Sequence, residues 1–271
     1  MGSDFGLTRW EPESGTFKSV GFTYEGTVHA LALNVASWTL YVGGDFANSG
    51  LFSWDGSEWS YLGLEMVNRL ALDSASGALY VVDGDGALFK WDEDVSALSS
   101  IEGAGFAIDL LVVDAARSAL HVGGTDLATW DTELAEWSYL ADGLSAGSLA
   151  LDPSSGALYV SDFRGWDSSS SMLRRWADGS WSSEVSYSAY AIAFDSARGA
   201  LLATGKGMYT WDGSAALQTE FGGPSGGGPP GIALAVHAPA CAAGNVPTIS
   251  GGACNACSPG LYVKDCGSNR R

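Results

Sequence analysis

Short runs of apolar residues, each ended by Asn or Asp, recur along the chain. They read HALALN, RLALDS, LLVVDA, SLALDP and AIAFDS, and they start at His29, Arg69, Leu110, Ser148 and Ala191. A second apolar run follows each of them as TLYVGG, ALYVVD, ALHVGG, ALYVSD and ALLATG, starting at Thr39, Ala78, Ala119, Ala157 and Ala200. Turn residues such as the SASG segment at Ser74 separate the two runs. The pattern therefore predicts a series of β-hairpins.

A tryptophan, usually followed by aspartate, marks the third element of the repeat. These tryptophans are Trp10, Trp54, Trp91, Trp130, Trp176 and Trp211. A fourth element reads EWSYL at Glu58 and at Glu136, and SWSSE at Ser180. The tryptophans recur about every 40 residues, which is the length of four short strands with their turns. A period of this length is typical of one blade of a β-propeller.

The hydrophobic pattern also indicates how such blades would pack. The first run of each repeat is almost continuously apolar, as expected for an innermost strand that lies between two neighbouring blades. No single blade can bury both of its faces, and radial repetition solves this problem while leaving only short edges. The sequence therefore predicts an all-β β-propeller of five whole blades, in which the repeated tryptophans are packing wedges.

The two ends of the repeat region each carry part of one more blade. Trp10 and residues 16–21 are predicted to form a third and a fourth strand whose inner strands are missing. Residues 232–237, IALAVH, resemble an isolated first strand. Together they would form a composite sixth blade that closes the ring. The predicted propeller then covers residues 1–237, and residues 222–231 are a linker rich in Gly and Pro.

Composition supports a folded β protein and limits its partners. The chain is 46% hydrophobic and 16% charged, and it contains 37 glycines and 11 tryptophans, which suit tight turns and half-buried strands. Its 31 acidic and 13 basic residues leave a net charge of −18, which disfavours nucleic acid and anionic membranes and favours cations or basic partners. The same charge would also serve solubility. We find no apolar stretch long enough for a membrane span and no secretory signal at the start.

The tail, residues 238–271, differs in composition from the rest of the chain. It holds all the cysteines, namely Cys241, Cys254, Cys257 and Cys266. Four cysteines in a short segment without its own core favour disulfide stapling in an oxidising compartment, with three possible connectivities. A zinc site is the alternative, although the one CxxC has neither a second CxxC nor paired histidines. We interpret the tail as a disulfide-stapled and truncated module.

Two segments resemble known families. The stretch ALALNVASWTLYVGGDFANSGLFSWDGSEWSYLG resembles the repeats of kelch-like and galactose-oxidase-central-domain-like propellers, and more closely the LYVGGxF…WDGxxWxxLG repeats of cortical polarity-marker proteins. That resemblance implies a six- or seven-bladed, usually non-enzymatic propeller that mediates interactions or belongs to a large surface protein. The string GGACNACSPGLY resembles the start of an ephrin-receptor-like or EGF-like cysteine-rich module, which implies an extracellular or cell-surface location.

Residues that could perform chemistry are few. His29, His121 and His237 are scattered among the elements and do not indicate a triad or a metal cluster. Asp83 and Asp85, with the acidic residues at 92–94, offer oxygen atoms suited to calcium, but such strings are also ordinary glycine–aspartate turns. Phosphate-loop and dinucleotide fingerprints do not occur. We therefore predict no catalytic residue, no cofactor and no metal site.

The aromatic residues separate two hypotheses about binding. Repeated tryptophans could stack on sugars, but a tryptophan at one place in every copy is better explained by packing between blades. Trp38, Trp166 and Tyr187 do not repeat and are the candidates for ligand contacts on loops. We expect a monomeric, non-enzymatic binding, adhesion or scaffold propeller within a larger surface or secreted protein, with a protein or glycan partner. The alternatives are a lectin-like propeller and a hydrolase or lyase with its site at the channel mouth.

Overall fold

The computed structural model describes most of the repeat region and two short strands of the tail. The described residues are 7–11, 16–19, 21–22, 25–47, 49–93, 95–144, 146–162, 172–185, 189, 191–196, 198–204, 208–211, 218–221, 245–247 and 254–256. Within these ranges the chain is β-structure with turns, apart from one 3₁₀ turn, η1 (Ala115–Arg117). No helix in the described part of the chain is long and apolar enough to cross a membrane.

Five four-stranded antiparallel sheets follow one another along the chain, each in simple up-and-down order. The first blade holds β3 (Gly26–Asn34), β4 (Thr39–Phe46), β5 (Ser49–Trp54) and β6 (Trp59–Gly63), and the second holds β7 (Val67–Leu72), β8 (Leu79–Asp83), β9 (Leu88–Asp92) and β10 (Ala97–Ile101). The third holds β11 (Ile108–Asp114), β12 (Ala119–Gly124), β13 (Leu127–Asp131) and β14 (Glu136–Ala141). The fourth holds β15 (Ala146–Leu151), β16 (Leu158–Asp162), β17 (Met172–Ala177) and β18 (Ser180–Val185), and the fifth holds β19 (Ala191–Asp195), β20 (Ala200–Thr204), β21 (Met208–Trp211) and β22 (Gln218–Phe221).

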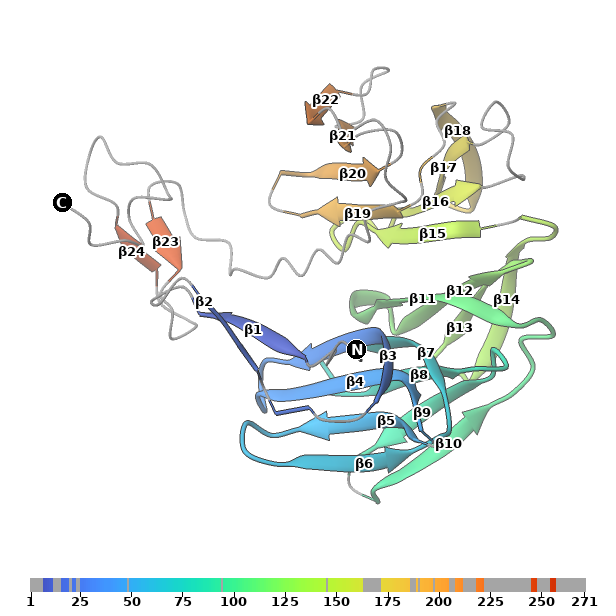
Figure 1. The fold of residues 1–271 in the computed structure, drawn as a ribbon. Helices are drawn as coiled ribbons and strands as arrows, with labels where there is room; N and C mark the ends of the chain where they lie inside the picture. Colours follow the sequence, from blue (N-terminus) through green and yellow to red (C-terminus); the bar gives the residue numbers. More distant parts are fainter. Residues whose placement is uncertain are drawn as a thin grey trace.

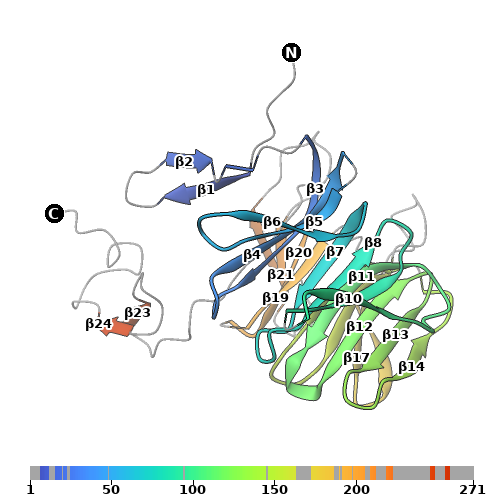
Figure 2. The same ribbon diagram turned by 90° about the horizontal axis from the view of Figure 1, so that it is seen from below.

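The five blades lie along an arc with their first strands innermost. In chain order, β3 contacts β7, β7 contacts β11, β11 contacts β15, and β15 contacts β19. Figure 1 shows the first blade, drawn in blue, and the fifth, drawn in orange, at the two ends of this arc. Figure 2, turned by a right angle, shows the strands of successive blades side by side. The five whole blades predicted from the repeat are confirmed.

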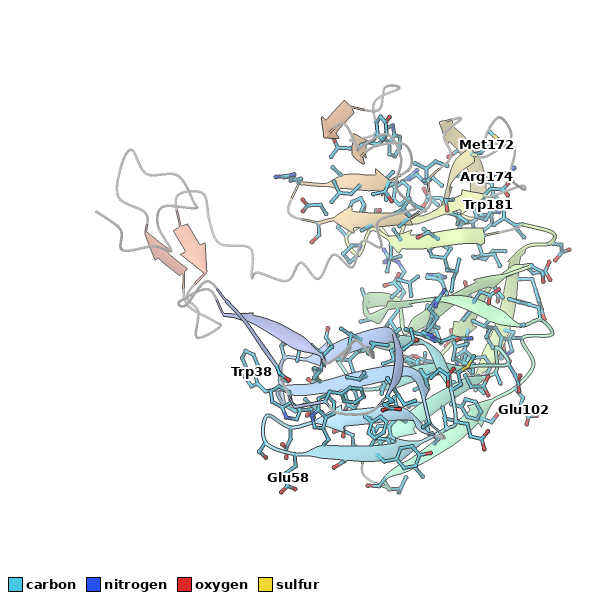
Figure 3. The ribbon with its side chains drawn as sticks, viewed as in Figure 1. Trp38, Glu58, Glu102, Met172, Arg174 and Trp181 are labelled. Carbon is cyan, nitrogen blue, oxygen red and sulfur yellow. The ribbon has the colours of Figure 1, made fainter. Side chains whose placement is uncertain are left out.

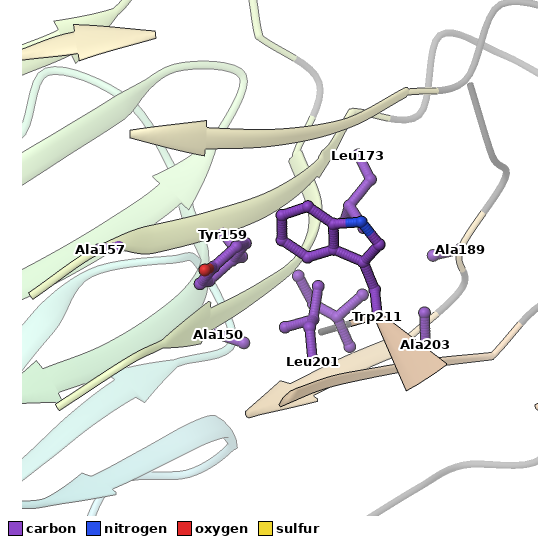
Figure 4. Close-up of a cluster of buried hydrophobic side chains, with 9 residues drawn as sticks. Ala150, Ala157, Tyr159, Leu173, Ala189, Leu201, Ala203 and Trp211 are labelled. Carbon is purple, nitrogen blue, oxygen red and sulfur yellow. The ribbon is translucent and has the colours of Figure 1, made fainter. Parts of the chain in front are cut away.

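The hydrophobic core is divided among the junctions between blades. Buried apolar residues form five clusters, and each cluster joins one blade to the element before it. Between the fourth and fifth blades, Tyr159 packs against Leu201 and Trp211 (Figure 4). The ring of Tyr159 also stacks on Phe194 with centroids 5.8 Å apart. Because each of these junctions buries the facing sides of two adjacent sheets, the stability of a blade depends on the blades beside it.

The repeated tryptophans lie at these junctions. Trp91, Trp130, Trp176 and Trp211 belong to the clusters that face the preceding blade, and Trp54 stacks on Trp59 at a centroid distance of 5.9 Å.

Tryptophans of the fourth strands add directional bonds across the junctions. Trp137 donates its Nε1–H to the carbonyl oxygen of Glu102 at 2.8 Å, and Trp181 donates to that of Leu140 at 3.1 Å. Leu140 lies in the last strand of the preceding blade, and Glu102 directly follows that strand in its own case. Glu102 and Trp181 can be located in Figure 3. Each half-buried indole thus satisfies its donor while its ring packs at the junction.

The repeated Asn and Asp residues form the turns. Asp73 and Asp152, at the end of first strands, accept bonds from the turn that follows; the Oδ1 of Asp152 accepts the N–H of Ser154 at 2.9 Å. After the third strand, the Oδ1 of Asp55 accepts the N–H groups of Glu58 and Ser57, each at 2.8 Å. These donors hold the pKa of Asp55 below its ordinary value. The aspartates that recur in the repeat therefore stabilise its turns by accepting backbone hydrogen bonds.

A short N-terminal sheet precedes the first blade. β1 (Thr8–Glu11) pairs with β2 (Thr16–Ser19), and Trp10 lies opposite Phe17 just as Trp54 lies opposite Trp59. The pair thus has the register of a third and a fourth strand, as predicted. The strand ends at Ser19, two residues earlier than expected, because its hydroxyl accepts the N–H of Gly21 in a turn.

The described residues of the tail form a sheet that the sequence did not predict. β23 (Asn245–Pro247) pairs antiparallel with β24 (Cys254–Ala256). Residues 232–237, which were predicted to form an isolated first strand, lie outside the described residues.

Titratable side chains occupy the same place in several second strands. The phenol of Tyr41 donates a hydrogen bond to Glu93 of the second blade, and burial raises the pKa of Tyr41 well above its ordinary value. His121 replaces tyrosine in the third blade, where its Nδ1 lies 2.8 Å from the Thr129 hydroxyl oxygen. Its Nε2 is buried without a partner among the described residues. Burial lowers the pKa of His121, so this junction contains a neutral imidazole.

Replacing Leu127 by Ala tests the idea that the junctions stabilise the ring. Leu127 is fully buried between the third and fourth blades, so we expect the variant to lose about 2–5 kcal/mol of unfolding free energy. Leu134→Ala is the matched control, because Leu134 lies in the same blade and is 68% exposed; it should change stability by no more than about 0.5 kcal/mol. Urea unfolding measures both, and equal losses would contradict the packing described.

Replacing His121 by Gln tests the neutral state of this buried group. Because burial lowers the pKa of His121 in the folded chain, the unfolded chain binds the proton first as the pH falls through about 6.5. The free energy of unfolding should therefore decrease from about pH 7 to about pH 5. His121→Gln should reduce this decrease, whereas His29→Gln should retain it. An unchanged pH dependence in the His121 variant would contradict the assignment.

Candidate binding surface at the mouth of the ring

The first strands of four blades begin with the same β-bulge. Register shifts occur between Val28 and Ala30, Val67 and Arg69, Ile108 and Leu110, and Ala146 and Ser148. The extra residues are His29, Asn68, Asp109 and Gly147. Because the first strands lie side by side and run in the same direction, these residues gather at one end of the ring. We call this end, where the innermost strands begin, the mouth.

The bulge residues differ in chemistry although their backbone repeats. His29 and Asp109 are exposed, and Gly147 carries no side chain. Asn68 donates its Nδ2–H to the carbonyl oxygen of Gly84 at 3.4 Å, which joins the bulge to the neighbouring turn. A β-bulge changes the direction of a side chain relative to a regular strand. The scaffold therefore presents different groups from successive blades at one end of the ring.

Acidic side chains surround the mouth. The connections from a fourth to a first strand, and from a second to a third strand, lie at this end because neighbouring strands are antiparallel. The exposed acidic residues of this end are Glu25, Asp45, Glu65, Asp85, Glu102, Asp109 and Asp142. Arg69 is the exposed basic side chain that the described residues place with them. The resulting negative potential favours cations and basic groups.

In the acidic segment that suggested a calcium site, Asp83 accepts hydrogen bonds within a turn. The Oδ1 of Asp83 accepts the N–H of Asp85 at 3.0 Å and that of Ala87 at 2.8 Å. Glu93 is engaged by the phenol of Tyr41, and the Oδ1 of Asp92 accepts the N–H of Val95 at 3.4 Å. Among the described residues, no group of three or more His, Cys, Asp or Glu side chains is placed to hold a metal ion.

A buried ion pair lies below the mouth in the fourth blade. Arg174 on β17 contacts the Oδ2 of Asp162, the last residue of β16, at 3.0 Å, and the Asp162 side chain is fully buried. Arg174 is labelled in Figure 3. Removing one partner from such a pair leaves an uncompensated buried charge, so the pair fixes the second strand against the third.

Of the three residues proposed as ligand contacts, the structure describes Trp38. Trp38 is 63% exposed, but it lies in the turn after β3, at the opposite end of the ring. Trp166 and Tyr187 lie outside the described residues, and so do Cys241, Cys257, Cys266 and His237. Cys254 is described only as part of the backbone of β24.

Sequence reasoning missed the bulge residues as a group. A signal for them exists, because His29, Asn68 and Asp109 are polar residues directly before or at the start of the apolar runs. Their position at one end depends on the side-by-side packing of the first strands, which the sequence does not show.

Comparison with known proteins identifies the fold. No family model matches the chain, and no curated protein is similar to it in sequence. Among solved structures, a chain of a nidogen/laminin complex matches with a TM-score of 0.56 at 14% identity, covering 76% of this chain and 84% of that one.

Two enzymes have similar structures. The GH74 enzyme of Niastella koreensis matches with a TM-score of 0.60 at 19% identity, covering 75% of this chain and 40% of its own. The gluconolactonase XC5397 of Xanthomonas campestris matches with a TM-score of 0.54 at 20% identity, covering 74% and 78%. This chain therefore spans about two fifths of the length of the GH74 enzyme. Identities this low show the fold alone: the chain has the β-propeller fold.

Proposed function

We propose that this chain is a non-enzymatic binding propeller that holds a protein partner at the mouth of its ring. The observation that carries the proposal is the recurring bulge, which presents His29, Asn68 and Asp109 from three successive blades at one end. A repeated backbone that carries different side chains at the mouth suits the binding of a specific partner, because binding residues are commonly carried on loops and strand ends of a rigid scaffold.

The other polar residues of the repeat support a binding role over catalysis. Asp55, Asp73 and Asp152 accept bonds within turns, and the shifted pKa values of Tyr41 and His121 belong to groups buried in the blades. A catalytic site is usually where perturbed titratable groups meet in a cleft. The glycosidase and gluconolactonase neighbours nevertheless keep a hydrolase as the competing hypothesis.

The charge of the mouth favours a basic partner. Asp109 and Glu65 are exposed there, and the whole chain carries a net charge of −18. A lysine- or arginine-rich segment of a protein would be attracted to the acidic mouth, whereas nucleic acid would be repelled. The nidogen/laminin neighbour is compatible with a protein partner.

The proposed setting is a surface or secreted protein of which the propeller is one monomeric part. The support is the cysteine-rich tail, whose Cys241, Cys254, Cys257 and Cys266 we propose to be disulfide-bonded, and its resemblance to ephrin-receptor-like and EGF-like modules. The kelch-like and polarity-marker-like repeats support the same setting.

Replacing Asp109 and Glu65 by Lys tests the mouth as a binding surface. We expect the unmodified chain to bind a ten-residue peptide of alternating Lys and Gly, and the double variant to bind it about 10-fold more weakly. Glu58→Lys with Glu136→Lys reverses the same number of charges at the opposite end, where Glu58 is labelled in Figure 3, and should retain binding. Isothermal titration at two salt concentrations measures both, and added salt should weaken binding.

Three outcomes would contradict the proposal. Equal weakening by both double variants would mean that net charge alone attracts the peptide. Binding of oligosaccharides on a glycan array, lost when Trp38 is replaced by Ala, would favour the lectin-like propeller. Turnover of a glycoside or lactone, lost in the Asp109 variant, would favour the hydrolase.

Titration of free thiols in the native chain tests the proposed compartment. Disulfide-bonded cysteines should leave the chain without reactive thiols until a reductant is added. Four reactive thiols before reduction would contradict the disulfides and remove the main support for an extracellular setting.

A further inference from the structure

The innermost strand of the first blade exposes an apolar face. Leu31 is 51% exposed and Leu33 is 47% exposed. They lie opposite Val42 and Leu40, so all four side chains share one face of the sheet. Val42 and Leu40 belong to the cluster that includes Phe22, which precedes the blade in the chain. The exposed leucines therefore face away from the second blade, at the open end of the arc.

The equivalent residues of the next blades are covered. Leu70 and Leu72 of β7 pack in the cluster that contains Tyr41 of the first blade. Leu111 and Val113 of β11 pack in the cluster that contains Tyr80 of the second. Because each blade repeats the same packing, the exposure of Leu31 and Leu33 marks the place of one more inner strand.

The outer part of the same face already has its neighbour. Phe22 is buried against Phe46, Phe52 and Trp59, with ring centroids 5.0, 5.6 and 4.7 Å away. Leu7 packs in the same cluster. These two residues flank β1 and β2, which pair in the register of a third and a fourth strand. The residues that flank this pair of strands therefore pack on the outer part of the face, whereas its inner part, at Leu31 and Leu33, is exposed.

We propose that residues 232–237 of this chain lie against Leu31 and Leu33 as the innermost strand of a sixth blade, whose outer strands are β1 and β2. Their sequence, IALAVH, has the same alternation as HALALN of residues 29–34. They are also the next apolar run after the fifth blade, and every earlier first strand in the chain follows directly on the blade before it.

The connecting chain is long enough for this placement. β22 ends at Phe221, and the residues from 222 to 231 precede the apolar run. Ten residues span up to about 33 Å when extended. A four-stranded sheet is only about 15 Å across, since neighbouring strands lie about 4.8 Å apart. The connection can therefore return from the outermost strand of the fifth blade to the centre of the ring.

The side chains of the run also match the junctions already described. Ala235 occupies the place in the repeat that Ala32 holds in the first blade, where Ala32 packs in one cluster with Leu70 and Leu72. In the fourth blade Ala150 meets Ile192 in the same way. A small residue on one blade thus faces large residues on the next, and Ala235 would face Leu31 and Leu33.

A pair of introduced cysteines tests the contact in the full chain. We expect Leu31→Cys with Ala235→Cys to form a disulfide within one chain under mild oxidation, identified by peptide mapping of the monomer fraction. Leu134→Cys with Ala235→Cys is the control, because Leu134 is exposed in the third blade, away from the open end; this pair should remain unlinked. Thermal unfolding should show that both double variants are folded.

A second pair of variants tests the same contact without cysteine. Ala235→Asp places a charge against Leu31 and Leu33 and should lower the melting temperature by about 5 °C or more. Ala240→Asp, outside the apolar run, should leave it within about 1 °C.

Two results would overturn the proposal. If the cysteines at 31 and 235 link only between two chains, a second copy covers the face. If they do not link at all and Ala235→Asp melts like Ala240→Asp, the apolar run lies elsewhere. Neither result bears on the mouth, so binding of the basic peptide is tested independently.

Discussion

Burial of two faces by every sheet is the constraint on which this structure depends. A four-stranded blade is apolar on both sides, and the second strands carry residues such as Tyr80 and Val81 whose side chains enter clusters on opposite faces. Each face can be covered only by a neighbouring blade, so a closed ring would be needed to bury both faces of every blade. Loss of packing at a junction between two blades therefore lowers the stability of both blades.

Most polar groups next to the apolar junctions have hydrogen-bond partners, so few of them lower the stability of the packing. The indole of Trp137 donates to Glu102 across a junction, and the carboxylate of Asp152 completes a turn. One exception is His121, whose Nε2 lies buried without a partner among the described residues, at a place where the first, second and fourth blades have tyrosine. Repeated residues form the packing and the turns, so the residues of the bulges at the mouth can differ between blades. The proposed binding function depends on these bulge residues.

The sequence predicted the fold accurately, but it did not single out the bulge residues at the mouth. The order of the strands, the tryptophan period and the N-terminal pair were all predictable, because each depends on local alternation and turn residues within about 40 positions. The mouth was not predictable, because His29 and Asp109 belong to different blades and lie at the same end only because the first strands pack side by side in the same direction. The short β23–β24 pair was missed since its strands lack a hydrophobic pattern.

The amino-acid sequence by itself determined the blades: the alternation of apolar residues, the closing tryptophan and the Asp-capped turns specify each four-stranded sheet through interactions close in the chain. Only the tertiary structure decided which faces are covered and which side chains meet. Leu31 and Leu70 occupy the same place in the repeat, yet one is half exposed and the other packs against a neighbour. The difference arises from position in the ring, because burial depends on what lies beside a blade.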